Sequence, residues 1–145
     1  MNLNPKIWGP HAWFFLDSII LSLPNKLNNE QKIIYKNFFT SLQNILPCEL
    51  CREHYKENLN QYPLTDNILS SKENMIRWII NIHNNVRKKA KKIPISINKY
   101  FKYYDKSYDE NKKKQQIVKD CNFKYYISIV IILILLLFII HKFKS

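Results

Sequence analysis

Apolar residues recur at intervals of three and four along most of this chain, and no stretch alternates apolar and polar residues for long. Such spacing places the apolar side chains on one side of an α-helix, whereas alternation would indicate a strand. The pattern therefore predicts an all-α protein. The predicted helices run from Pro10 to Pro24, over 29–46, over 48–60, from Ser70 to about 90, and over 96–104.

The apolar faces of two of these helices are marked clearly. The second predicted helix carries its stripe at Ile34, Phe38, Leu42 and Ile45. The fourth begins with Ser70 and Glu73 in the spacing of a capping box, which satisfies the free N–H groups of a helix start. Its buried face is predicted to comprise Met75, Trp78, Ile79, Ile82, Val86 and Ala90.

The chain becomes polar and loses its periodicity from Asp105 to Asp120, which predicts a linker. Residues 125–140 are uncharged and mostly apolar. As a helix they span roughly 24 Å against a hydrocarbon core of ~30 Å, and Lys124 and Lys142 extend that reach by snorkelling. A transmembrane tail anchor is favoured over a buried core helix because the run has no polar face.

Composition excludes some classes of function. The chain has one glycine, whereas Rossmann and P-loop nucleotide sites need several to bring the backbone close to phosphate. The net charge of +12 predicts a basic surface that faces solvent or an anionic membrane. Specific nucleic-acid binding is less favoured, because lysines far outnumber the three arginines.

Cys48 and Cys51 form a CxxC motif, which leaves redox chemistry and zinc binding as alternatives. A zinc site would use His54 with His83 or His11, although the spacing is not that of a zinc finger. Cys48 lies at a predicted helix N-terminus, which stabilises a thiolate, and is therefore the better exchange thiol. Cys51 lies one turn further on, a position suited to facing a cofactor.

A second candidate region is formed by His83, Asn84 and Arg87 on one side of the fourth predicted helix. A lone histidine there is usually a core residue, but here an asparagine and a basic turn follow it. This pattern is able to hold the ring and pyrophosphate of a large anionic, aromatic cofactor. Trp8, Trp13 and Trp78 would supply stacking surface, although aromatic residues at helical spacing more often form ordinary core.

These residues carry a family resemblance. Residues 8–16, 46–54 and 78–86 resemble, in order and spacing, three motifs of the Erv/ALR family of FAD-linked sulfhydryl oxidases, and most resemble its members from large cytoplasmic DNA viruses. The resemblance covers roughly residues 5–105. It implies a four-helix bundle with a short fifth helix that holds FAD, with Cys48 exchanging with substrate thiols and Cys51 passing electrons to the flavin.

The resemblance also implies a set of cofactor-binding residues and no metal. The FAD contacts would be Trp8, Gly9, Trp13, Asp17, His54, His83, Asn84, Val86, Arg87, Lys88 and Lys92, of which Lys88 and Lys92 match basic positions near the phosphates. Two residues depart from the family pattern, because Asp17 stands where a histidine is common and Arg87 where an asparagine is common. These departures weaken two individual flavin contacts.

The resulting hypothesis is an FAD-dependent thiol oxidase that forms disulfides in protein dithiols and reduces oxygen to hydrogen peroxide. Its domains would be the oxidase at 1–105, a basic linker at 106–124 and the anchor at 125–140, with the oxidase on the cytosolic side, in host cytoplasm or on a virion membrane. Expected partners are a protein dithiol, for which a thioredoxin-like relay protein is one candidate, and a second copy of the chain, with no specific nucleic acid.

Two other functions stay open from the sequence. One is a non-enzymatic zinc-binding or nucleic-acid-binding membrane adaptor, and the other is a cofactor-free family member that acts as an interaction module. The role of Cys121 is also open, since an odd cysteine before the apolar run suits a spectator thiol, S-palmitoylation or pairing between two subunits.

Overall fold

A computed structural model describes residues 3–144, without the side chains of residues 111, 112, 114, 121 and 133–144. The helices are α1 (Pro5–Leu21), α2 (Asn29–Ile45), α3 (Glu49–Gln61), the short 3-10 helix η1 (Ile68–Ser70), α4 (Lys72–Lys89) and α5 (Ile97–Lys144). In the described range the only β-type pairing is an isolated bridge between Lys26 and Ser71. The all-α prediction is confirmed.

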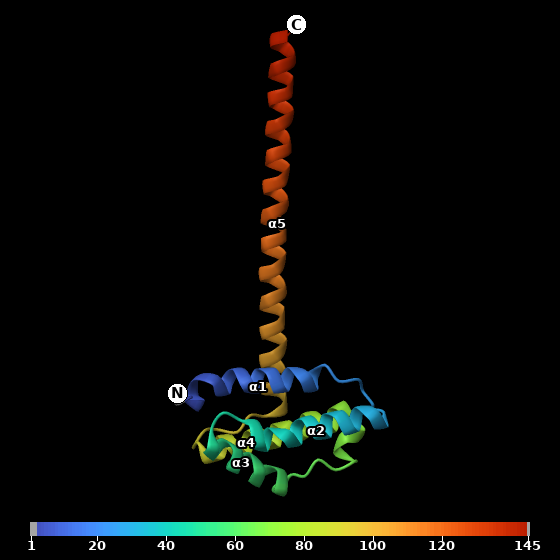
Figure 1. Cartoon of the computed structure of the whole chain (residues 1–145), viewed down its shortest axis with the longest axis vertical. Helices are drawn as coiled ribbons and strands as arrows, with labels where there is room; N and C mark the ends of the chain where they lie inside the picture. Colours follow the sequence, from blue (N-terminus) through green and yellow to red (C-terminus); the bar gives the residue numbers. More distant parts are fainter. Residues whose placement is uncertain (1–2, 145) are drawn as a thin grey trace. The chain divides into compact units, whose positions relative to one another are not determined.

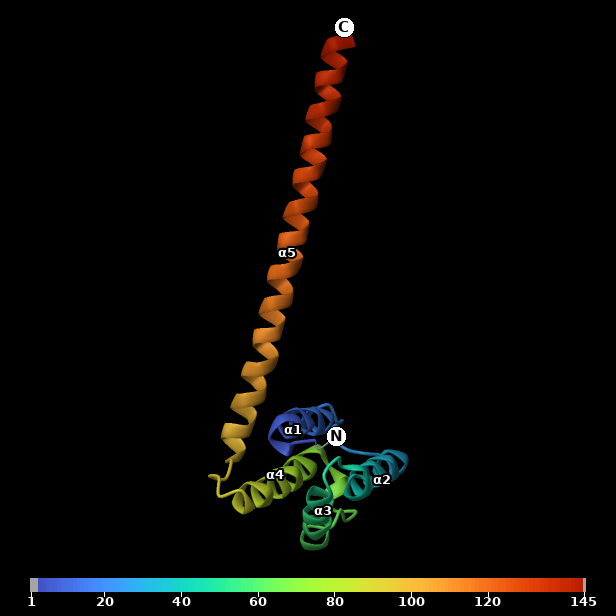
Figure 2. The same cartoon turned by 60° about the vertical axis from the view of Figure 1, so that its left-hand side comes forward.

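The chain divides into two compact units, Met1–Ile97 and Asn98–Ser145. The first unit contains α1 to α4 and η1, and its four α-helices pack side by side (Figure 1). Helix α4 packs against both α1 and α3, and α3 also packs against α2 (Figure 2). The four-helix arrangement is therefore held together through α4.

Two predicted helix starts are wrong. Helix α1 begins at Pro5 rather than Pro10, because the Asn4 side chain accepts a hydrogen bond from the Lys6 N–H at 2.9 Å and Pro5 suits a first helical position. Helix α4 is capped by Ser71 rather than Ser70. Ser71 is extended and its Oγ accepts from the Asn74 N–H at 3.2 Å, whereas Ser70 belongs to η1.

The predicted stripe of α2 is only partly buried. Leu42 is buried and Phe38 is half-buried, but Ile34 and Ile45 are exposed. The deeply buried side chain is Phe39, which contacts Trp78 of α4 edge-to-face with ring centroids 5.3 Å apart. The helix is rotated so that Phe39 faces the core, and this leaves apolar side chains on its outer face.

The predicted face of α4 is confirmed over most of its length. Met75, Trp78, Ile79 and Ile82 are buried, whereas Val86 is half-buried and Ala90 is exposed. The core formed around them also contains Ile20 of α1 and Leu69 of η1.

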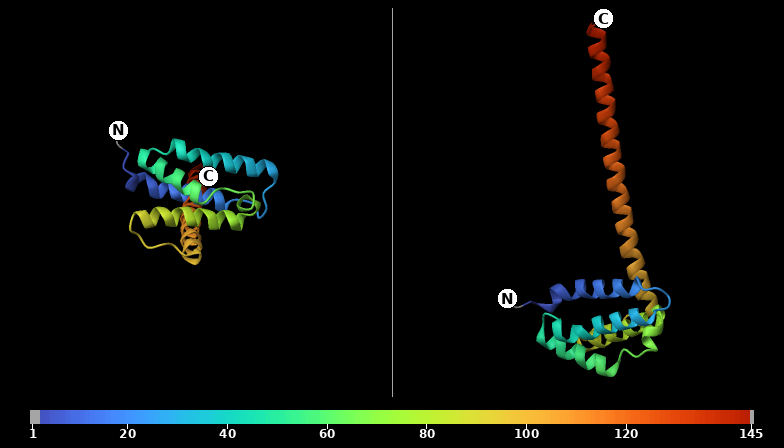
Figure 3. Two further views of the ribbon diagram at one scale, coloured as in Figure 1. Left: turned by 90° about the horizontal axis from the view of Figure 1, so that it is seen from below. Right: turned by 45° about the vertical axis from the view of Figure 1, so that its right-hand side comes forward.

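The second unit consists of α5 (Figure 3). Its backbone is helical from Ile97 to Lys144, so the short fifth helix predicted at 96–104 is wrong, and the polar stretch 105–120 predicted as a linker is helical. The physical reason is that the chain contains no proline or glycine after Pro94, and the lysines, glutamate and glutamines of the polar stretch have good helix propensity.

No helix among the described residues is long and apolar enough to cross a membrane. The second half of the predicted anchor, residues 133–140, lies outside the described side chains. The same holds for Cys121.

Candidate functional site

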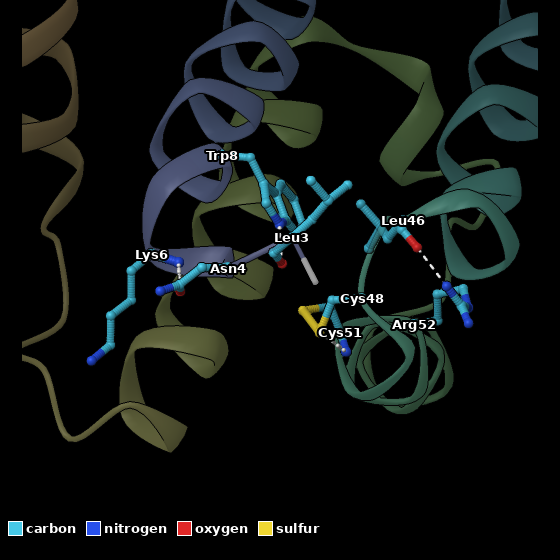
Figure 4. Close-up of a disulfide and its surroundings, with 8 residues drawn as sticks. All are labelled: Leu3, Asn4, Lys6, Trp8, Leu46, Cys48, Cys51 and Arg52. Atoms are coloured by element: carbon cyan, nitrogen blue, oxygen red, sulfur yellow. Dashed lines mark hydrogen bonds between the residues drawn. A yellow bond between two sulfur atoms is a disulfide. The ribbon is translucent and has the colours of Figure 1, made fainter. Parts of the chain in front are cut away.

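The site is organised around a disulfide between Cys48 and Cys51, at the turn from α2 to α3. The two Cα atoms are 5.0 Å apart. Pro47 follows the end of α2, and Cys48 is the N-cap of α3, with its Sγ accepting from the Cys51 N–H at 3.3 Å. Arg52 stabilises the turn, because its guanidinium donates a hydrogen bond to the Leu46 carbonyl at 2.7 Å (Figure 4).

The two sulfur-bearing residues border different spaces. Cys48 lines an open groove together with Leu3, Pro5, Pro47, Glu49, Leu50 and Glu53. Cys51 lines a largely apolar cavity of about 170 Å³ inside the bundle. A single disulfide thus connects the surface with the interior.

All four helices of the bundle contribute to the apolar cavity. Its remaining lining residues are Pro5, Trp8, Gly9, Ala12, Trp13 and Leu16 from α1, Leu42 and Leu46 from α2 and its end, His54 and Tyr55 from α3, and Val86 from α4. The Trp8 indole N–H donates to the Leu3 carbonyl at 3.3 Å, beside the disulfide (Figure 4). Of the predicted site residues, the structure therefore brings Trp8, Gly9, Trp13, Cys51, His54 and Val86 together.

His83 of α4 stacks on Trp13 of α1, with ring centroids 4.1 Å apart and planes inclined by 4°. Its Nδ1 lies 4.0 Å from a carboxylate oxygen of Asp17, which is fully buried on α1. Burial, together with the charges of Arg87 and Lys92, lowers the pKa of His83 to about 4. The imidazole is therefore neutral at pH 7 and presents a flat, uncharged ring.

Asn84 and Arg87 hold the loop after α4. The Asn84 amide donates to the Ile95 carbonyl at 3.0 Å and accepts from the Ile95 N–H at 2.7 Å. Arg87 Nε donates to the Ile93 carbonyl at 2.7 Å. These two side chains thus have structural partners, and their predicted contacts to FAD stay predictions.

Lys88 and Lys92 are exposed at the end of α4. The helix ends in a Schellman motif, in which the Lys92 N–H donates to the Arg87 carbonyl at 2.8 Å and the Lys91 N–H to the Lys88 carbonyl at 3.0 Å. Lys91 takes the left-handed conformation, with φ of 55°, that this motif requires. The motif presents a cluster of lysines at the helix end.

Sequence reasoning missed a polar contact between α3 and α4. Asn85 donates to the side-chain oxygens of Asn58, at 2.5 Å, and Gln61, at 2.9 Å. Asn58 is fully buried, and the signal that could have found it is its spacing of three residues from Tyr55, which places both side chains on one face of α3. A salt bridge from Lys89 to Glu57, which lowers the pKa of Glu57, joins the same two helices.

The zinc alternative gains no support from this geometry. Cys48 and Cys51 are bonded to each other, so neither offers a thiolate in this state. In the part of the chain that the structure describes, no three His, Cys, Asp or Glu side chains gather in an arrangement that would hold a metal ion.

Comparisons with known proteins agree on one family. The sequence model of the Erv1 / Alr family matches residues 10–109. A relative named a probable FAD-linked sulfhydryl oxidase, from Acanthamoeba polyphaga mimivirus, is 44% identical over 82 residues, which are 57% of this chain and 57% of the relative. An FAD-linked sulfhydryl oxidase of an African swine fever virus isolate is 31% identical over 100 residues, 69% of this chain and 82% of that one.

Solved structures show the same fold. The core of yeast Erv1 superposes with a TM-score of 0.62 at 26% identity, over 68% of this chain and 80% of that one. The FAD binding domain of Erv1 from Saccharomyces cerevisiae gives the same TM-score and identity over 67% of this chain and 90% of that one.

The neutral state of His83 predicts a pH dependence of stability. Below its ordinary pKa of 6.5 the unfolded chain takes up a proton that the folded protein takes up only near pH 4. The free energy of unfolding should therefore fall as the pH falls from 7 to 4, by about 3 kcal/mol from this residue, and level off below. Urea unfolding at several pH values measures this pH-dependent contribution to the free energy of unfolding. His83→Gln should remove the contribution, whereas His11→Gln, at an exposed position, should retain it. An unchanged pH dependence in His83→Gln would contradict the assignment.

Proposed function

The chain belongs to the Erv1 / Alr family, and on that basis we propose that it is an FAD-dependent sulfhydryl oxidase that converts protein dithiols to disulfides and reduces dioxygen to hydrogen peroxide. The observation that carries this proposal is the placement of the Cys48–Cys51 disulfide between an open groove and an apolar cavity. Electrons from an external thiol can enter on one side and leave on the other.

The cavity fits part of the proposed cofactor. Two tryptophans and aliphatic side chains line it, and the neutral His83 ring stacks on Trp13 and so holds one flat surface for a heteroaromatic ring in place. At about 170 Å³ it is smaller than typical cofactor pockets of roughly 300–1,000 Å³, so part of the molecule would lie outside it. The lysine cluster with Lys88 and Lys92 has the charge to bind phosphates.

The remaining predicted contacts are retained as proposals. Trp8, Trp13, His54 and Val86 would hold the flavin ring, with Gly9 beside them. A methyl group added at Gly9 would meet no atom within 4 Å, so the glycine leaves open space on this wall. FAD, when bound, supplies a two-electron acceptor that the side chains lack and passes the electrons to dioxygen.

The chain's own chemistry is thiol–disulfide exchange. A substrate thiolate attacks Cys48 Sγ, a mixed disulfide forms, and Cys51 leaves as a thiolate. The second substrate thiolate then attacks the substrate sulfur of that bond and releases Cys48 as a thiolate. The substrate has lost two electrons and the CxxC pair has gained them. Cys51 then lies at the cavity, in the position from which the pair is reoxidised.

The start of α3 assists the exchange. The Cys51 N–H that donates to Cys48 Sγ at 3.3 Å is one of the free N–H groups of the first helical turn. The same N–H group and the helix dipole would stabilise Cys48 as a leaving thiolate. This arrangement favours release of the oxidised substrate.

The cysteine assignments predict distinct variants of the full chain. Cys51→Ser should retain bound FAD, visible as yellow colour, and lose oxygen consumption with dithiothreitol by at least about 100-fold, because no dithiol can form. Cys48→Ser should lose the activity equally. Cys121→Ser is the matched control and should oxidise dithiothreitol at the unsubstituted rate. A Cys51→Ser protein as active as the unsubstituted one would contradict the assignment of Cys51.

We also propose that residues 125–140 anchor the protein in a membrane, in an infected cell or a virion, with the oxidase on the cytosolic side. The support is the uncharged run in the sequence, the excess of lysine in 106–124 over the segment after the run, and the viral source of two relatives. The division into an oxidase domain at 1–105 and a basic segment at 106–124 is part of this proposal.

The anchor predicts that the full chain stays in the membrane pellet after carbonate extraction. Ile132→Lys should release most of it, since a lysine near the middle of the run costs about 3 kcal/mol of insertion free energy. Ile117→Lys, an equal change outside the run, should stay in the pellet. Recovery of the unsubstituted chain in the supernatant would rule the anchor out.

A homodimer and a thioredoxin-like relay partner are further proposals. The dimer is supported by exposed apolar side chains on α1 and α2, among them Ile7 at 71% and Phe15 at 60% exposure on α1 and Ile34 at 54% on α2. Light scattering of the solubilised full chain should give twice the mass of one chain. Phe15→Glu with Ile34→Glu should give one chain's mass, and Ile93→Glu, on a loop, should leave the dimer intact.

A further inference from the structure

The groove beside Cys48 is lined by the first turns of α3, the Pro47 turn and the start of α1, and has a volume of about 510 Å³. Two of its lining residues are carboxylates, Glu49 and Glu53, one helical turn apart on α3. Two others, Leu50 and Leu3, are apolar and exposed at 58% and 46%. The groove therefore combines negative charge with exposed apolar surface next to the exchange sulfur.

This local charge is opposite to that of the whole chain, which is +12. None of the residues that line the groove is a lysine or arginine. The neighbouring Arg52 donates its hydrogen bond to the Leu46 carbonyl. Among the described residues no ion pair involves Glu49 or Glu53. On the same helix Glu57 does have such a partner, Lys89. The two groove carboxylates are thus available to a ligand from outside.

A substrate thiolate that approaches Cys48 brings a negative charge towards these carboxylates. The approach is unfavourable unless a cation on the substrate accompanies the sulfur, because like charges repel at this range. A lysine or arginine beside the reacting cysteine supplies that cation and also lowers the pKa of the substrate thiol, which increases the thiolate fraction. An apolar side chain nearby would cover Leu50 and Leu3.

We propose that this groove docks a partner polypeptide whose reactive cysteine is flanked by a basic residue and an apolar residue. The proposal rests on the proposed oxidase function and adds the class of substrate. The exchange is the one described above, in which the partner's thiolate forms the mixed disulfide with Cys48 and its second thiol completes the partner disulfide. Dioxygen is the final acceptor of the two electrons that the partner dithiol loses.

The test compares two reduced CxxC peptides of equal length that both contain leucine, one with flanking lysines and one with flanking glutamates. Oxygen consumption by the full-chain holoenzyme is measured for each peptide and divided by the rate with dithiothreitol, so that changes in the disulfide itself cancel. The charge of the whole chain and the charge of the groove predict opposite preferences between the two peptides. The overall charge of +12 would favour the acidic peptide, whereas the groove favours the basic one.

The expected result is a preference for the lysine peptide of about threefold or more at low salt, decreasing as salt is added. Glu49→Gln with Glu53→Gln should abolish the preference, and Glu49→Lys with Glu53→Lys should reverse it. Glu30→Lys, in the first turn of α2 and about 25 Å along that helix from the Pro47 turn, is the matched control and should keep the preference.

Equal rates for the two peptides, a preference for the acidic peptide, or an unchanged preference in the double Gln variant would overturn the proposal. A holoenzyme that oxidises neither dithiothreitol nor the peptides would instead overturn the proposed function. The two failures are therefore distinguishable.

Discussion

The contact between Phe39 and Trp78 is the interaction on which the rest of the bundle depends. The two rings meet edge-to-face in the core, and each residue also anchors a neighbouring segment through a hydrogen bond. The Trp78 indole N–H donates to the Tyr62 carbonyl at 2.8 Å, and the Tyr55 hydroxyl donates to the Phe39 carbonyl at 3.0 Å. Helices α2, α3 and α4 are thereby fixed relative to one another. The CxxC turn lies between two of these helices, so its position follows from this contact.

Two titratable side chains in the interior of the bundle are kept uncharged at neutral pH. Burial raises the pKa of Tyr55, which therefore stays protonated, and lowers that of His83, which stays unprotonated. Charged groups are placed outside, with lysines at the end of α4 and carboxylates at the start of α3. An uncharged aromatic lining and a lysine cluster are suited to a cofactor that has a flat ring and phosphates, and the carboxylates are suited to a substrate that carries a cation beside its reacting thiol.

The CxxC motif gains its asymmetry from the packing around it. Both cysteines are in one helical turn and have similar local chemistry, yet Cys48 borders the groove and Cys51 borders the cavity. The difference arises because Trp8 and Trp13 of α1 line the cavity that Cys51 borders, while Cys48 faces the groove formed by the first turns of α3 and the start of α1. The roles proposed for the two thiols, exchange with substrate for Cys48 and electron transfer to the cofactor for Cys51, follow from these different surroundings.

The helical class, the break at Pro47, the CxxC motif and the buried face of α4 could be predicted from local features of the chain, because they follow from apolar spacing, from proline and from the thiols. The resemblance of three motifs also identified half of the residues that line the cavity. Other features became known from the packed helices: which face of α2 is buried, that Asn84 and Arg87 hold the loop after α4, and that Asn58 and Asn85 join α3 to α4. These features depend on side chains that are far apart in the sequence, and the distance between such residues is decided by how the helices pack and not by their spacing along the chain.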